Sequence, residues 1–156
     1  MVDTLDRELL IKLMEDASKP IYKLAQELGV SRQTLSKRLK KLEQDFSLRY
    51  MAIPDLSKLG LNLKAYIMVR VSPSDYARRR VEAKVKKLKQ IAQAHYIYGH
   101  YDMLLEVLVK DRDELSKILD SIHKIEGVIE TETFIVREVV KYRPLDPIIK
   151  AVKQQK

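Results

Sequence analysis

The stretch 21–43 (IYKLAQELGVSRQTLSKRLKKLE) constrains the fold more than any other part of this 156-residue chain. It reads as two helices joined by a tight turn, because Gly29 can adopt the left-handed conformation that ends a helix and Ser31 is a good N-cap for the next one. The second helix carries one apolar stripe at helical spacing, formed by Leu35, Leu39 and Leu42. Two short helices with this turn and this stripe are typical of a helix-turn-helix unit.

The face of the second helix away from the stripe is basic. Residues 31–42 contain five Lys or Arg side chains and no acid. Such a helix can pack through its apolar stripe while the opposite face meets the phosphates and bases of DNA. The sequence therefore predicts DNA-binding residues at Ser31, Arg32, Gln33, Thr34, Ser36, Lys37, Arg38, Lys40 and Lys41.

We expect the N-terminal half of this helix to read bases and the remainder to contact phosphate. The expected base-contacting residues are Arg32, Gln33, Ser36 and Lys37, since Gln can pair with adenine and Arg with guanine through two hydrogen bonds. The expected phosphate contacts are Ser31 and Thr34 near the helix N-terminus, and Arg38, Lys40 and Lys41. For Lys40 and Lys41 the alternative is a solvated helix end.

The sequence predicts four parts in the chain, the first of which contains this helix-turn-helix unit. A first helix is expected at 3–16, with Asp3 as its N-cap. Residues 48–56 (LRYMAIPDL) should be extended, since Pro54 excludes a helix, and we interpret them as a wing-like strand. The predicted boundaries are 1–46 for the helix-turn-helix domain, 47–62 for the wing and linker, 63–143 for a second domain and 144–156 for a C-terminal tail.

The second domain has the order strand, helix, strand, strand, helix, strand. Apolar residues alternate in 63–71 and 102–109, as in strands with one buried face. The other elements are a helix over 75–92, a strand over 94–100, a helix capped by Asp111 and a strand over 128–142. The chain is thus predicted to be an α+β protein, with a winged helix-turn-helix followed by a ferredoxin-like βαββαβ domain whose helices cover one face of an antiparallel sheet.

The second face of that sheet is expected to be unusually apolar. It should carry Tyr66, Met68, Leu104 and Leu108. An apolar face in so small a domain favours pairing with a second copy of the chain. The alternative is that the tail, with a helical stripe at Leu145, Ile148, Ile149 and Val152, covers it.

Composition and the absence of known motifs narrow the classes of function that the chain can have. The chain has no cysteine, which excludes disulfides and thiolate metal sites, and His95, His100 and His123 lack the spacing of metal ligands. We find no nucleophile elbow, P-loop, dinucleotide fingerprint or HExxH motif, so neither an enzyme nor a resident cofactor is expected. No apolar run could span a membrane, which favours a cytoplasmic protein. Four glycines and 33% charged residues favour a thermophilic or archaeal source.

A second basic segment lies at residues 78–89. The net charge of +8 is unevenly distributed, since residues 64–90 are strongly basic while residues 95–140 are acidic. The basic segment could contact DNA wrapped around an oligomer, meet the acidic region of a neighbouring copy, or be a solvated helix face.

In this order and spacing, several short motifs resemble the Lrp/AsnC (feast/famine) family of transcription regulators. The motifs are LDRELL at 5–10, LAQELGVS at 24–31, Thr34-Leu35, RLKKLE at 38–43, KLG at 58–60 and GHYD at 99–102. The resemblance covers about 3–143. One departure is clear, because the family usually places a glycine soon after the Leu-Glu that ends the recognition helix, and residues 44–49 contain none.

The resemblance implies a homodimer that docks two recognition helices on a pseudo-palindromic operator in double-stranded DNA and that can assemble into octamers. It implies that the ferredoxin-like domain is of the ligand-sensing RAM type, which mediates assembly and can bind an amino acid between subunits. Carried over to this chain, the effector-binding candidates are Gly99, Tyr101, Asp102, Thr131 and Thr133.

Two other functions fit the same architecture. Sirohaem decarboxylases resemble it, and His95, His100 and the arginines at 78–80 could line a pocket for a polycarboxylate tetrapyrrole. The second alternative function is that of a ligand-sensing assembly protein that has lost DNA binding. Both are disfavoured by the fully basic outer face of the helix at 31–43, which neither function needs.

Overall fold

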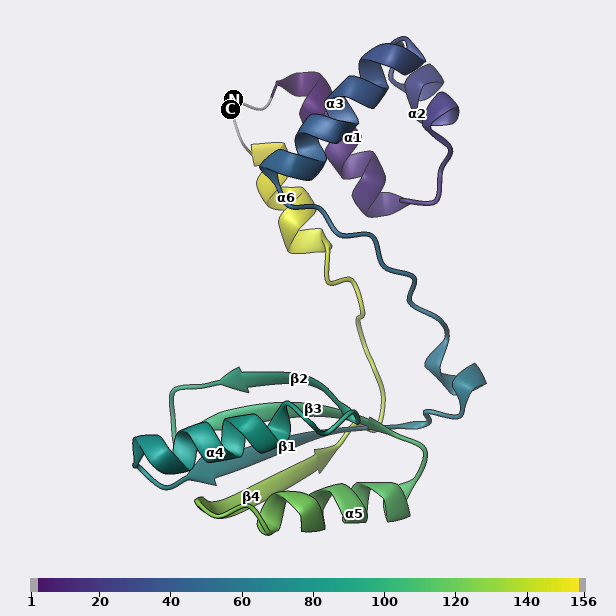
Figure 1. The fold of residues 1–156 in the computed structure, drawn as a ribbon. Helices are drawn as coiled ribbons and strands as arrows, with labels where there is room; N and C mark the ends of the chain where they lie inside the picture. The colour runs from purple at the N-terminus through teal and green to yellow at the C-terminus, as the bar shows by residue number, and fades with distance from the viewer. Residues whose placement is uncertain (1–2, 155–156) are drawn as a thin grey trace. The chain divides into compact units, whose positions relative to one another are not determined.

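The computed structural model describes residues 3–154, which form two compact units (Figure 1). One unit contains α1 (Thr4–Glu15), α2 (Ile21–Glu27), α3 (Arg32–Asp45) and α6 (Asp146–Gln154). The other contains β1 (Leu63–Val71), α4 (Asp75–Val85), β2 (Ile91–Tyr96), β3 (Met103–Val109), α5 (Arg112–His123) and β4 (Val128–Ile135), preceded by a 3-10 helix at Leu56–Leu59. Except for the wing-like strand expected at 48–56, the helices and strands follow the predicted order.

The helical unit is built on the apolar stripes that the sequence predicted. Its core joins α1, α2 and α3 through Leu9, Leu13, Leu24, Leu35 and Leu42. The Asp3 carboxylate caps α1 by accepting a hydrogen bond from the backbone N–H of Asp6, over 2.9 Å. Capping and the buried leucines together fix the orientation of α3 on α1 and α2.

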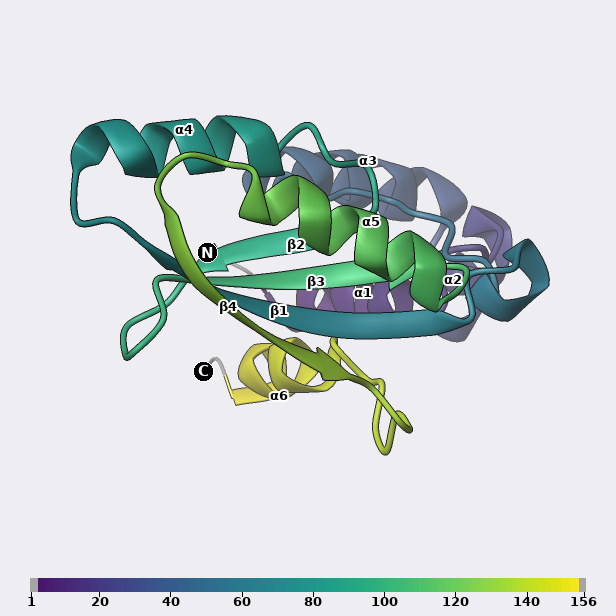
Figure 2. The ribbon, with the colours of Figure 1, turned by 90° about the horizontal axis from the view of Figure 1, so that it is seen from below.

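The C-terminal helix belongs to the helical unit. Helix α6 contacts α1 (Figure 1). Its residue Val152 is buried. The possibility that this segment covers the second face of the sheet is therefore wrong for the described residues. Its apolar stripe packs within the helical unit, and among the described residues of the sheet unit no helix lies on that second face (Figure 2).

The wing-like strand expected at 48–56 is absent. Residues 48–55 are not helical, as Pro54 requires, but none of them is assigned to a strand. A strand needs a hydrogen-bonding neighbour, and the described part of this chain supplies none to these residues.

The second unit is the ferredoxin-like sheet. Its four antiparallel strands lie in the order β2-β3-β1-β4, and α4 and α5 cover one face (Figure 2). Alternate residues of the two central strands, among them Ile67, Val69, Leu105 and Val107, are fully buried under the helices. The fold class predicted from the sequence is confirmed.

Three elements were predicted with the wrong bounds. The strand expected at 94–100 is β2, which runs from Ile91 to Tyr96, and the other two are α4 and β4. Helix α4 ends at Val85, not at 92, because residues 86–90 turn and Ile91 already begins β2. Strand β4 ends at Ile135, not at 142. Its partner β1 begins at Leu63, so beyond the bond from the Val136 N–H to the Lys64 carbonyl the chain has no strand to pair with.

Candidate nucleic-acid interface

Helix α3 begins at a well-formed cap. The Ser31 hydroxyl accepts a hydrogen bond from the backbone N–H of Thr34 over 3.1 Å, and the two hydroxyls lie 2.9 Å apart. Leu35 and Leu42 are buried beneath the helix. The cap and the buried stripe hold the opposite face of α3 toward solvent.

Most of the predicted DNA-binding residues lie on that exposed face. Ser36 is half-buried, and the exposed ones are Ser31, Arg32, Gln33, Thr34, Lys37, Lys40 and Lys41. None of the basic residues in this set has an acidic partner among residues 3–154. Their positive charge is therefore available to a polyanion.

Arg38 differs from its neighbours. Its guanidinium donates to the Asp6 carboxylate over 2.8 Å and also to the Asp3 carboxylate, both on the α1 side of the unit. Arg38 is half-buried and Asp6 is only 2% exposed. The structure thus gives the Arg38 side chain an internal partner, where the sequence predicted a phosphate contact.

These contacts also shift the pKa values of Arg38 and Asp3. The hydrogen bond to Asp6, followed by the one to Asp3, raises the pKa of Arg38. The backbone hydrogen bond from Asp6 and then the bond to Arg38 lower the pKa of Asp3. The charged forms of both partners are therefore favoured, which stabilises the attachment of α3 to the start of α1.

Asp6 was missed as part of this arrangement, although the sequence carried a signal. Its spacing from Leu9 and Leu13 places it on the buried face of α1, where an unpaired carboxylate is costly. A basic partner on the adjoining helix was therefore required. A hollow between α1 and α3 is lined by Asp3, Asp6, Thr34, Lys37, Arg38 and Lys41.

Two of the predicted effector residues, Tyr101 and Thr133, lie toward opposite faces of the sheet within a subunit. The Tyr101 hydroxyl donates to Glu132 over 3.0 Å, and Glu132 pairs with Met68 on the sheet face that lacks helices. Partial burial and then this hydrogen bond raise the pKa of Tyr101. Thr133 pairs with Ile67, so it points to the helix-covered face.

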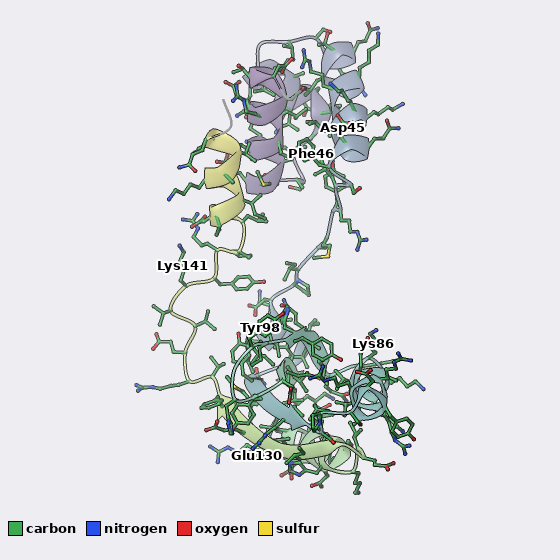
Figure 3. All side chains as sticks on the ribbon, turned by 90° about the vertical axis from the view of Figure 1, so that its left-hand side faces the viewer. Asp45, Phe46, Lys86, Tyr98, Glu130 and Lys141 are labelled. Carbon is green, nitrogen blue, oxygen red and sulfur yellow. The ribbon has the colours of Figure 1, made fainter. Side chains whose placement is uncertain are left out.

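Asp102 and Thr131 have structural partners. The Asp102 carboxylate accepts a hydrogen bond from the Val71 N–H over 2.7 Å and lies 4.0 Å from the Arg78 guanidinium. Thr131 lies 2.7 Å from the His123 ring nitrogen. Gly99 has a φ of +147° in the loop between β2 and β3, next to Tyr98, which Figure 3 labels. The Asp102 contact joins the end of β1 to the residue before β3, and the Thr131 contact joins β4 to the end of α5.

Other kinds of site were sought in the described residues. No group of three or more His, Asp or Glu side chains within 3–154 could hold a metal ion. None of the helices in that range is long and apolar enough to cross a bilayer.

Comparison with known proteins identifies both units. Residues 2–43 match the AsnC-type helix-turn-helix domain, and residues 64–146 match the Lrp/AsnC ligand binding domain. The chain belongs to the Lrp/AsnC family of transcriptional regulators. It is 33% identical to an HTH-type transcriptional regulator of Pyrococcus abyssi over 90% of this chain and 96% of that protein.

Solved structures agree with this family. AsnC of E. coli is 28% identical, with a TM-score of 0.82 over 92% of this chain and 97% of that one. A transcriptional regulator from Neisseria meningitidis in complex with L-Met is 25% identical, with a TM-score of 0.87 over 95% and 99%. This Lrp/AsnC chain is therefore a DNA-binding regulator by family, and the relatives named here give no support to the sirohaem-decarboxylase alternative.

Proposed function

We propose that α3 is the recognition helix of a sequence-specific regulator that binds a pseudo-palindromic operator in cytoplasmic DNA. The observation that carries this proposal is the exposed row of Arg32, Gln33 and Lys37, held outward by the Ser31 cap and the buried leucines beneath. These side chains can present donors and acceptors to base edges in the major groove. Lys40 and Lys41 then hold phosphate.

Arg38 has a different role in this proposal. Because its guanidinium is bound to Asp6 and Asp3, it fixes the angle of α3 on α1 and leaves phosphate contact to the lysines. A recognition helix held by an ion pair as well as by leucines loses less conformational entropy on binding.

We further propose that two copies pair through the helix-free face of the sheet. Tyr66, Met68, Leu104 and Leu108 lie half-buried there, beside Phe134, which is 47% exposed. Two of the charges on this face, Lys64 and Glu106, form an ion pair over 2.8 Å. A second copy can therefore cover the apolar residues without leaving these two charges unpaired. We also propose that such dimers can assemble into an octamer.

An amino acid is the proposed effector, by analogy with the Neisseria meningitidis regulator that is in complex with L-Met. Tyr101 and Thr133 lie on opposite faces of the sheet in one subunit, which favours an effector site shared between two subunits. Thermal shifts with each L-amino acid test this. We expect Thr133→Val to abolish the stabilisation by the effective amino acid, whereas the solvent-facing change Ser116→Ala should not.

The DNA-binding proposal is tested by a mobility shift on the region upstream of the protein's own gene at several salt concentrations. Sequence-dependent binding that weakens steeply with salt is expected. A protein that binds no DNA but purifies with tetrapyrrole absorbance would instead be the enzyme.

A further inference from the structure

The basic surface of α4 has no role in the function proposed so far. Residues 78–89 contain seven Lys or Arg side chains and a single acid, Glu82. Figure 3 labels Lys86, which lies just beyond the end of this helix. The structure separates these charges into two groups on either side of the buried stripe of Ala77, Val81 and Val85.

The first group is neutralised within the subunit. Glu82 forms an ion pair with Lys86 and accepts a hydrogen bond from the Tyr96 hydroxyl over 3.2 Å. Arg78 lies 4.0 Å from Asp102. Helical spacing places Arg78, Glu82 and Lys86 on one flank of α4, so this flank already has its counter-charges.

The second group forms what we call the α4 basic row, made of Arg79, Arg80, Lys84 and Lys87. Together with Tyr76 and Ala83 these residues line an open hollow on the surface. Arg80 is bound to Glu126 over 3.1 Å and to the Tyr76 hydroxyl over 2.7 Å. Arg79, Lys84 and Lys87 have no acidic partner among the described residues, 3–154.

A solvated helix face does not explain the whole row. Lysines near the C-terminus of a helix are favoured by its dipole, which accounts for Lys84 and Lys87. Arg79 lies in the first half of α4, far from the C-terminal turn, so the dipole does not favour its charge, and the mutual repulsion of the row is a cost. A bound anion would offset that repulsion.

The shape of the site favours an extended polyanion over a small ligand. Sites for small molecules are concave, mostly apolar and bury most of the ligand, whereas this hollow is open and follows a helix surface. From Arg79 to Lys87, which lies two residues beyond the end of α4, the row extends about 12 Å at the rise of 1.5 Å per residue of an α-helix. Neighbouring phosphates of a nucleic-acid strand could meet several of its side chains at once.

We propose that the α4 basic row is a second, sequence-independent contact for the phosphate backbone of double-stranded DNA next to the operator. The inference rests on the proposed function, since it needs a protein that first binds its operator through α3. The row adds affinity for flanking DNA of any sequence and steepens the salt dependence of binding to long fragments.

The test compares two triple variants of the full-length protein. One is Arg79→Gln/Lys84→Gln/Lys87→Gln. The matched control is Arg112→Gln/Lys117→Gln/Lys124→Gln on α5, which removes the same residue types and the same charge from exposed positions of the same unit. Each protein is titrated against a duplex limited to the operator footprint and against one extended by about two helical turns, ~20 bp, on each side.

We expect the α4 variant to bind the short duplex like the wild type. On the extended duplex its plot of log K against log salt should be shallower by about 0.9 for each lost phosphate contact. The α5 control should match the wild type on both duplexes.

Equal binding of the two variants to the extended duplex would overturn the inference while leaving the proposed function intact. A wild type that binds neither duplex would overturn the proposed function itself. If the α4 variant alone changed the sedimentation of the DNA-free protein, with DNA binding unaltered, the row would be a contact between copies and the inference would be wrong.

Discussion

Arg38 on α3 donates a hydrogen bond over 2.8 Å to the carboxylate of Asp6, which is nearly inaccessible to solvent on α1. A buried carboxylate is stable only with a partner that satisfies its charge. The residues are 32 positions apart in the sequence, so their contact fixes α3 against the start of the chain. The recognition helix is thus oriented by a charged contact in addition to its leucines.

Replacing Arg38 should therefore damage the fold of the helical unit more than it damages phosphate binding. We expect Arg38→Ala to lower the free energy of unfolding by about 1–3 kcal/mol, because Asp6 loses its charged partner. Urea denaturation followed by circular dichroism measures this. Lys40→Ala is the matched control, because Lys40 is exposed on the same helix, and it should change stability little. Equal effects of the two changes would contradict the assigned role of Arg38.

Acid should loosen the same unit through Glu27. Its carboxylate binds Lys12 and then Lys19, and these hydrogen bonds lower its pKa below the ordinary value of 4.5. A lowered folded-state pKa gives stability that is present above pH 4.5 and is lost as the pH falls through the folded value. Glu27→Gln should therefore be less stable than the wild type at pH 7 and equally stable at pH 2. A constant difference across a series of denaturation curves would count against this pairing.

The junction of α5 and β4 leaves no room for a side chain. Gly127 has a φ of +102°, and a Cβ there would lie 2.6 Å from the Cβ of Ala77 on α4. Gly127→Ala should cost about 1–3 kcal/mol from overpacking, in addition to backbone strain. Gly60→Ala is the control, since Gly60 also has a positive φ but open space around it. Thermal melts that ranked the two variants equally would show that Ala77 moves aside.

Pairing of two copies should depend on the middle of the helix-free sheet face. Leu104 lies opposite Met68 there, so Leu104→Glu would place a charge within the proposed dimer interface. We expect analytical ultracentrifugation to show a monomer for Leu104→Glu. Ser116→Glu adds the same charge on the exposed surface of α5 and should leave the dimer intact. A dimer that survives the Leu104 change would place the interface elsewhere.

Local patterns predicted the fold well because most of its information lies in short-range spacing. The leucine stripe of α3, the alternation in β1 and β3 and the caps at Ser31 and Asp111 all come from residues close in sequence. The end of β4 depends instead on where its partner β1 begins. The two strands are far apart in the sequence, so the β-branched residues of β4 alone do not show where β4 ends. Helix α6 also depends on a distant part of the chain. Its apolar stripe predicted that it packs against another element, but did not show that this element is α1.

Side-chain roles were harder to predict than elements. The exposed face of α3 followed from helical spacing alone, so most of the candidate interface lies where the sequence placed it. Arg38 was grouped with the other basic residues because charge type does not show which distant acid a side chain will meet. Tyr101 and Thr133 were joined through resemblance to a family, and the strand register separates them within one subunit.

The measurement that tests the central claim most directly is selection of binding sites from random DNA duplexes by the wild type and three variants of α3. Lys41→Ala should recover the same preferred sequence as the wild type with weaker binding and a flatter salt dependence. Arg32→Ala and Gln33→Ala should each change the preferred bases, by about 1–3 kcal/mol for each lost base contact. If all three variants selected the wild-type sequence with similar loss of affinity, α3 would not be the helix that reads the operator.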